Sequence, residues 1–488
     1  MDLVKNISLD EKFSFTGKAK SKIITLIIAG AVLAVIGFVL LQIDSGHGHG
    51  HEAHAGGDHK TAAKEALVEV TDEVTAVEQK DSHGHVEEVI VAKETITAVE
   101  PIKAEEHAHH GKPVWAKRII KDIWQNNVFF GGIALIGVFF LAFNYVAYAG
   151  WSALIKRVPE AFGYYLPVFA VLTFILIGLF GHDIFHWMDS SLYKEFLEDG
   201  KTLNPHYDEI ISSKTWWLST FSFWVRIIIY FVLWIFFWYT LRKKSMQEDI
   251  SGGISFYDRS IVWSAGFLVI FGVTSSTSAW DLVMSMDPHF FSTMFGWYVF
   301  ASWLVSGFSM ITIIVITLKE NGYLKMVNEN HLHDLGKFMF AFSIFWTYIW
   351  FEQFLLIYYS NIPEESYYFI ERLLNGTYKP LFFLTFFINF IFPFIVLMTR
   401  NAKRQMIILK IVAIFILVGH WLDFFMMMTP PMLHNDGGFD YKFFFLELGI
   451  TMVFLGFFLY AVLTGLSKAG LIAKNHPMIE ESIHHHVY

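Results

Sequence analysis

Apolar residues run along this chain in stretches of about 20, the length that an α-helix needs to cross the hydrocarbon core of a bilayer. The pattern predicts ten membrane helices, over residues 23–43, 128–148, 161–181, 216–241, 261–284, 293–318, 336–358, 380–399, 405–428 and 443–466. The first stretch follows a Lys-rich head, as in a signal peptide, but it is too long and lacks a small-residue cleavage site near Gln42. We therefore expect an uncleaved anchor and an all-α multi-pass membrane protein, with about ten helices.

These stretches divide the chain into a basic head (1–22), a first transmembrane helix (23–43), a long loop (44–127), a nine-helix membrane body (128–466) and a tail (467–488). The short loops after helices 2, 4, 6 and 8 hold eleven Lys and Arg, whereas those after helices 3, 5, 7 and 9 hold six. Lys and Arg gather in cytoplasmic loops. We therefore expect both termini in the cytoplasm, the 44–127 loop in the periplasm, and a location in the bacterial inner membrane.

Composition sharpens this picture. Hydrophobic residues make up 54% of the chain and charged residues 17%, against about a quarter charged in soluble proteins. The absence of cysteine excludes disulfides, thiolate-bound metals, cysteine-bound iron–sulfur clusters and covalently attached haem c within this chain. Residues 44–110 hold 15 acidic and 5 basic residues, which accounts for the net charge of −9 and leaves a nearly neutral body. Such a charge distribution gives no indication of nucleic-acid binding.

The 44–127 loop has low complexity and is rich in histidine, with His47, His49, His51, His54, His59, His83, His85, His107, His109 and His110. We expect a largely disordered, solvated acidic tether, because such a composition buries little apolar surface. Binding of Zn, Cu or Ni by clustered imidazoles is the alternative. The terminal triplet of His484, His485 and His486 fits a natural end or a tag and supports no prediction.

Ionisable side chains inside membrane helices are costly, so they mark functional sites or buried ion pairs. Arg226 lies near the middle of its helix and needs an acid or backbone carbonyls as partners. The candidate acids are Asp281, Glu352, Asp423 and Glu447, all in the outer half of the membrane under the expected topology. His420 and Asp423 are three residues apart and share a helix face. A quinone or proton site and simple polar packing between helices are the two interpretations.

Two further clusters lie at helix ends. His182, Asp183 and His186 close the third predicted helix, with the two imidazoles on one helical face. They suit quinol or proton chemistry or an interfacial cap, and less well a metal. Five successive hydroxyls at 274–278 precede Asp281 and suit a water wire or close helix packing.

On the expected cytoplasmic side, His331, His333 and Asp334 lie at the mouth of the 336–358 helix. They are candidates for a proton entry, or they form a hydrated helix start. We find no nucleotide-binding or nucleophile motif, so we assign no catalytic residue and no metal site, and we expect no complete reaction from this chain alone.

Two segments resemble a known family. Residues 285–298 read SMDPHFFSTMFGWY, and residues 331–337 read HLHDLGK and lead to FEQ at 351–353 and NIPEE at 361–365. These motifs resemble the ActF subunit of bacterial alternative complex III, within the NrfD/PsrC-like family of integral membrane proteins. The resemblance is strongest over 215–430 and does not cover the His-rich insertion. The polar residues inside the matching motifs are Asp287, His289, His331, His333, Asp334 and Glu352.

The resemblance implies two four-helix bundles with peripheral helices, in a respiratory complex that oxidises quinol and reduces a cytochrome c or a terminal oxidase. It implies quinone as the bound cofactor, with menaquinone among the candidates, and haem c and iron–sulfur clusters in sister subunits. These partners would be a multihaem cytochrome c, an iron–sulfur subunit and a paralogous NrfD-like subunit, together with lipids. It assigns no quinone-binding residue to this chain.

Three hypotheses follow. The chain supplies a quinone pocket or proton path to a quinol-oxidising complex, it is a scaffold subunit of that complex, or it is an independent secondary transporter. Transporters commonly have helices broken by Gly or Pro at mid-membrane, whereas here only Pro393 interrupts the interior of a predicted span. We favour the first hypothesis.

Overall fold

The computed structural model describes residues 11–45, 68–80, 86–98, 112–196, 202–434 and 441–486. Within them, ten helical segments are long and apolar enough to cross a membrane, which confirms the predicted number. The single-helix spans are α1 (Gly17–Ser45), α2 (Val114–Val146), α6 (Thr220–Ser251), α8 (Phe295–Glu320), α9 (Glu329–Ser360), α13 (Met406–Leu433) and α14 (Tyr441–Ser467). The membrane body is all-α, and the chain is a multi-pass membrane protein.

Three spans combine helices of different kinds. They are α3 (Arg157–Phe162), η3 (Gly163–Tyr165) and α4 (Leu166–Ile184); α7 (Ile254–Leu282) and η6 (Met284–Met286); and α11 (Lys379–Phe386), the π-helix η7 (Phe387–Ile391) and α12 (Phe392–Val396). Short helices fill the connections: η2 (Gly150–Leu154), η4 (His186–Met188), η5 (Ser190–Tyr193), α5 (Glu209–Ser213), α10 (Pro363–Leu373), η8 (Ala402–Arg404) and α15 (Ile479–Ile483).

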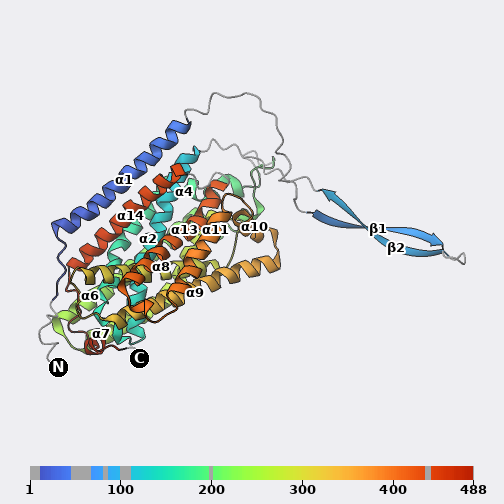
Figure 1. Ribbon diagram of the computed structural model, residues 1–488. Coiled ribbons are helices and arrows are strands. Elements are labelled where there is room, and N and C mark those ends of the chain that lie inside the picture. The colour runs from blue at the N-terminus through green and yellow to red at the C-terminus, as the bar shows by residue number, and fades with distance from the viewer. Residues whose placement is uncertain are drawn as a thin grey trace. The chain divides into compact units, whose positions relative to one another are not determined.

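The contacts group the long helices into two bundles (Figure 1). The first bundle contains α2, α4, α6 and α7, and the second contains α8, α9, α13 and the α11–η7–α12 span. Helix α2 also contacts α8 and α13, so it joins the bundles, and α14 packs on α2 and α3.

Helix α1 lies beside α14 through glycines (Figure 1). A Cβ atom on Gly30 would lie 2.7 Å from the carbonyl oxygen of Gly449, and one on Gly449 would lie 2.4 Å from the backbone nitrogen of Ala34. Small residues allow helix backbones to approach closely, which is a common way of packing helices in membranes.

Local sequence explains where several helices begin and end. Asn328 caps α9, since its side chain accepts a hydrogen bond from the backbone of His331 while the His331 ring accepts from the backbone of Asn328. Asn361 ends α9 in the left-handed conformation, with φ of 47°. Gly252 and Gly253 have φ of 67° and 84°, a turn that glycine makes readily, and they connect α6 to α7.

Helix α2 begins fourteen residues before the predicted span at 128–148, at Val114. The charged residues Arg118, Lys121 and Asp122 lower the hydropathy of this segment, and the prediction therefore placed them in the loop. In the structure they are fully buried and face charges of opposite sign, so the helix continues through them.

Residues 44–112 form a separate unit. Within it, β1 (Val68–Lys80) and β2 (Val86–Ala98) pair as an antiparallel hairpin, in the register Val68 to Ala98 and Lys80 to Val86. This differs from the expectation of a largely disordered tether, and the Val- and Thr-rich composition of both segments suits strands. The histidines proposed as metal ligands lie outside the described residues.

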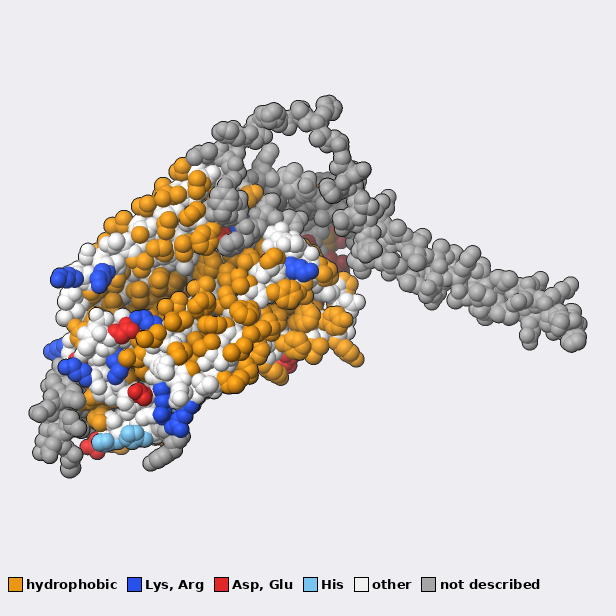
Figure 2. All heavy atoms as spheres, viewed as in Figure 1, with side chains coloured by type: hydrophobic (Ala, Val, Ile, Leu, Met, Phe, Trp, Pro, Cys, Tyr) orange, Lys and Arg blue, Asp and Glu red, His pale blue; other side chains and the backbone are white. Residues whose placement is uncertain are grey.

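The surface of the bundles fits a lipid environment. On the face shown in Figure 2, apolar side chains form a broad cover, while Lys and Arg gather mostly at the end where the C-terminus lies. Ile28, Val171, Val269 and Ile407 are among the large apolar residues that are more than half exposed. We call the end of the bundles that holds residues 468–486 the tail end.

Candidate functional site

A buried polar cluster lies within the second bundle, on the part of α13 that is distant from the tail end. Asp423 and His420 are one helical turn apart on α13, and their side chains are 1% and 0% exposed. The His420 Nδ1 atom lies 3.8 Å from Asp423 Oδ2. The prediction that these two residues share a helix face is confirmed.

Helices α8 and α9 supply the other members of this cluster. The Tyr298 hydroxyl donates a hydrogen bond to Asp423 Oδ1, and the Trp346 indole N–H donates to Asp423 Oδ2 at 2.9 Å. The Ser302 hydroxyl lies 2.9 Å from His420 Nδ1. All donors to Asp423 are therefore neutral, and the second ring nitrogen of His420 has no hydrogen-bond partner among the described residues.

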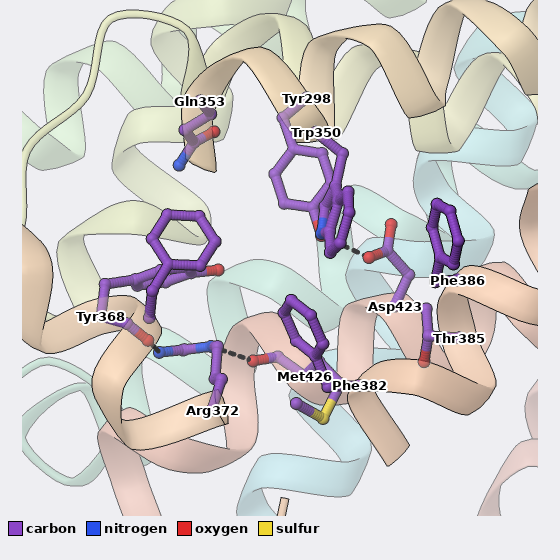
Figure 3. Close-up of a pocket in the computed structure, with 11 residues that line it drawn as sticks. Tyr298, Trp350, Gln353, Tyr368, Arg372, Phe382, Thr385, Phe386, Asp423 and Met426 are labelled. Carbon is purple, nitrogen blue, oxygen red and sulfur yellow. Dashed lines mark hydrogen bonds between the residues drawn. The ribbon is translucent and has the colours of Figure 1, made fainter. Parts of the chain in front are cut away.

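Asp423 also borders a small cavity (Figure 3). The volume of the cavity is about 20 Å³, which is space for about one water molecule and too little for a quinone ring. Its wall consists of Tyr298, Trp350, Gln353, Tyr368, Phe369, Arg372, Phe382, Thr385, Phe386, Asp423 and Met426. The Gln353 amide and the Thr385 hydroxyl have no partner within the described chain. A water in this cavity would therefore meet several unused donors and acceptors.

Arg372 closes the cavity from α10. Pro430 and Pro431 lie inside α13 and carry no N–H, so the carbonyls of Met426 and Met427 lose their usual helical donors. The Arg372 guanidinium donates to both carbonyls, at 2.8 and 3.4 Å, and also to the carbonyl of Tyr368 (Figure 3). Arg372 is thus held by three backbone carbonyls, and Glu371 lies 3.9 Å from its guanidinium.

Glu352 does not belong to this site. It is half-buried on another face of α9, and its neighbour Gln353, 3% exposed, lines the cavity instead. Adjacent helical residues point about 100° apart, so a motif read without an exact helix phase can select the wrong neighbour. The prediction that placed Glu352 with Asp423 is corrected here.

Arg226 pairs with Asp281, one of its four predicted candidates. The two guanidinium nitrogens Nε and NH2 lie 2.8 Å from the two carboxylate oxygens of Asp281. The Tyr230 hydroxyl and the Trp217 indole also donate to Asp281, at 2.8 and 3.0 Å. Asp281 is therefore engaged on both oxygens in an ion pair between α6 and α7.

The hydroxyls in the run before Asp281 form hydrogen bonds within their own helix, α7. The hydroxyls of Thr274, Thr277 and Ser278 donate to backbone carbonyls three or four residues earlier, at 2.9, 3.0 and 3.0 Å. The Trp234 indole N–H donates to Thr274 as well. These contacts favour helix packing over a water wire.

His182, Asp183 and His186 do not assemble into a site. Helix α4 ends at Ile184, and Phe185 adopts an extended conformation with φ of −122° and ψ of 96°. His186 consequently belongs to the next short helix, η4, and both imidazoles are exposed. The prediction of two imidazoles on one helix face is wrong because the helix does not extend that far.

Two buried charge clusters were not predicted as sites. In the first, Glu447 of α14 lies 3.0 Å from Arg118 Nε and 3.8 Å from Lys121 Nζ, and Lys121 lies 2.5 Å from Asp122. Glu447 was a predicted candidate, but its basic partners were assigned to the loop. Recurrence of polar residues every three to four positions from Arg118 to Gln125 is the signal that could have extended the helix.

The second cluster lies near the tail end and includes Lys156, Arg157 and Arg242, which the hydropathy pattern places in the loops between predicted spans. Arg157 and Arg242 each lie 2.9 Å from Glu160, and Lys156 lies 3.3 Å from Glu248. Burial lowers the pKa of Lys156, against the opposing effect of Glu248. The cluster joins α3 to α6 and serves the packing of the first bundle.

His331, His333 and Asp334 are buried rather than hydrated, with side chains and backbone together 0%, 6% and 5% exposed. The C-terminal segment covers them, and the His485 Nε2 atom lies 2.6 Å from Asp334 Oδ2. The sequence pattern gave no indication that the terminal histidines belong to the fold.

In the described parts of the chain, no three His, Asp or Glu side chains are grouped so as to hold a metal ion. No protein-family model matches the sequence, and no curated protein is significantly similar to it.

Proposed function

We propose that this chain is an integral membrane subunit of a respiratory complex that oxidises quinol and reduces a cytochrome c or another electron acceptor, and that Asp423 and His420 lie on its proton-conducting path. The motif resemblance at 285–298 and 331–353 supports the type of complex. The observation that carries the proton path is a buried acid whose hydrogen-bond donors in the described chain, Tyr298 and Trp346, are neutral, beside a buried imidazole and a cavity large enough for one water.

The chemistry of quinol explains why such a path is needed. Each quinol releases two protons on oxidation, and these must reach water through a low-dielectric environment. Carboxylic acids and imidazoles exchange protons at accessible cost only where hydrogen bonds and water accompany them. The Tyr298 hydroxyl and the Ser302 hydroxyl supply such bonds on either side of the Asp423 and His420 pair.

A second candidate role for the chain is to bind quinone, and a cleft elsewhere in the structure supports it. A cleft of about 250 Å³ lies beside the Arg226–Asp281 pair and shares Trp217 with it. Its wall contains Lys214, Trp216, Trp217, Trp280, Asp287, Phe290 and Phe291. Aromatic walls with a few polar groups suit a planar ligand, and this cleft has the room that the Asp423 cavity lacks. The haem c and iron–sulfur clusters would be held by the sister subunits.

Purification of the native complex tests the proposed assembly. Because residues 482–485 are hydrogen-bonded into the fold, the affinity tag belongs at the N-terminus. We expect the chain to copurify with a multihaem cytochrome c, an iron–sulfur protein and a paralogous membrane subunit, identified by optical spectra and mass spectrometry. A colourless chain that purifies alone from gently solubilised membranes would contradict the proposal and favour a transporter.

A further inference from the structure

The C-terminal segment is built into the tail end through specific hydrogen bonds. The Ser482 hydroxyl donates to the carbonyl of Trp151 at 2.7 Å and lies 3.2 Å from His331 Nε2. The carbonyl of His485 accepts from the side-chain amides of Asn328 and Asn330, at 3.0 and 3.1 Å. The backbone at His485 is therefore fixed over the start of α9.

This anchoring directs one imidazole at a buried acid. His485 Nε2 lies 2.6 Å from Asp334 Oδ2, and the His485 side chain is 17% exposed whereas that of Asp334 is 7% exposed. The neighbouring His484 and His486 are exposed. Of the three successive histidines, His485 is thus placed with one side toward water and one side toward the acid.

We propose that His485 is the relay through which protons pass between water at the tail end and Asp334. One ring nitrogen takes a proton from water, the other gives its proton to the Asp334 carboxylate, and the ring then flips so that its remaining N–H again faces Asp334; the same steps in reverse carry a proton from Asp334 to water. The inference rests on the proposed function in one respect, which is that Asp334 and Asp423 lie on one proton path.

The groups around Asp334 suit transient protonation. Lys337 Nζ lies 2.5 Å from Asp334 Oδ1, and His333 Nδ1 lies 4.0 Å from the same oxygen. The His331 ring lies 5.2 Å from the His485 ring, and Arg404 of η8 donates to Asn330 beside them. The ammonium group of Lys337 favours the carboxylate, but the Lys337 side chain is 50% exposed to water, which screens its charge, so Asp334 can take up a proton and readily pass it on.

The interior beyond Asp334 contains hydroxyls with unused hydrogen-bonding capacity. Ser343 lies nine residues further along α9, about 14 Å at the helical rise, and Trp346, which contacts Asp423, follows it. The hydroxyls of Ser343 and of Ser309 on α8 are buried without a partner in the described chain. Waters bridging these hydroxyls would connect Asp334 with the Asp423 cluster.

Two substitutions in the intact complex separate a relay from a structural contact. His485→Gln keeps an N–H donor for Asp334 but cannot carry a proton, and His485→Ala opens space for free imidazole. Infrared spectroscopy after a rapid drop in pH follows the carboxyl band of Asp334, identified as the band missing from Asp334→Asn. His484→Gln and His486→Gln are the matched controls.

We expect protonation of Asp334 to slow by about a hundredfold or more in both His485 variants, within the usual range for a lost proton-transfer group. Imidazole should restore the rate in His485→Ala, and both controls should match the wild type. Wild-type rates in His485→Gln would overturn the proposal, as would slow rates that imidazole does not restore.

A second measurement detects whether a substitution at His485 releases the C-terminal segment from the fold. Amide exchange over 476–486 should be unchanged in His485→Gln, and a slow rate accompanied by a released tail would overturn the relay in favour of a latch. The pH-drop experiment needs no quinol turnover. Failure of the proposed function would appear only in the turnover of Asp423 variants, which should protonate Asp334 at the normal rate.

Discussion

Asp281 and Asp423 are both buried carboxylates, but their partners give them different tasks. Asp281 faces the guanidinium of Arg226 with both oxygens, whereas Asp423 faces the neutral donors Tyr298 and Trp346. A carboxylate held by a guanidinium is a fixed anion, and one held by neutral groups can exchange a proton without stranding a positive charge. At the residue scale, this difference separates the structural acid from the candidate proton carrier.

Arg226→Leu tests the structural acid. The substitution leaves Asp281, which is 0% exposed, without its cation, and we expect a loss of roughly 3–5 kcal/mol of stability. The yield of assembled protein and its thermal unfolding in detergent report the effect. The double variant Arg226→Leu with Asp281→Leu should recover part of the loss. Normal yield and stability in the single variant would show that the pair is dispensable.

At this scale the sequence predicted which ionisable residues are buried more often than it predicted which residues they contact. Asp423, His420 and the need of Arg226 for an acid were all predicted, because ionisable residues in apolar runs are conspicuous. Gln353 was missed beside Glu352, since an uncharged amide gives no such signal. The partner of Arg226 remained one of four acids, because the choice depends on how α6 packs against α7.

At the element scale, Arg372 supplies hydrogen-bond donors that two prolines remove from α13. Pro430 and Pro431 deprive Met426 and Met427 of intrahelical donors, and Arg372 replaces both. A similar break occurs in the α11–η7–α12 span, where Pro393 follows Asn389 by four residues and the intervening turn is a π-helix. The sequence shows Pro393 inside a predicted span, but the π-helix beside it depends on packing and does not follow from the apolar pattern.

We predict that Arg372→Met lowers stability by about 1–3 kcal/mol for each carbonyl left without a donor. A double-mutant cycle with Pro430→Ala and Pro431→Ala isolates the cause, because these changes restore the helical donors. Chemical unfolding in mild detergent provides the four free energies. Equal losses from Arg372→Met in both backgrounds would mean that Arg372 acts through some other contact, such as its stacking on the Tyr368 ring.

At the scale of the whole molecule, the number of helices and their order follow from the apolar pattern, since each run must match the bilayer. The early start of α2 did not follow, because Arg118 pairs with Glu447 of α14, which lies far away in the sequence. The docking of the C-terminal segment was also beyond prediction. Its contacts with η2 and α9 join residues more than a hundred positions apart, and three histidines in a row have no periodic pattern.

Burial of His476 makes the attachment of the C-terminal segment sensitive to acid. Burial, with help from Lys156 and Arg157, lowers the pKa of His476 from 6.5 to about 2. The released segment therefore binds a proton that the docked segment does not. Docking is strongest above about pH 6.5 and weakens by roughly 1.4 kcal/mol for each pH unit below it. Protease cleavage within 468–486 should accelerate over this range, and His476→Gln should flatten the dependence. An unchanged pH profile in the variant would assign the effect to other groups.

The central claim is that Asp423 carries protons during quinol oxidation, and proton release coupled to turnover in liposomes tests it most directly. Asp423→Asn preserves the size and the hydrogen-bond acceptor but removes the titrating group, while Glu352→Gln on the same bundle is the matched control. In fully assembled complex, we predict that Asp423→Asn slows quinol-dependent turnover by about a hundredfold, as expected for loss of a proton-transfer group, and that Glu352→Gln does not. Normal turnover and proton release in assembled Asp423→Asn would contradict the account and leave the cluster a role in helix packing alone.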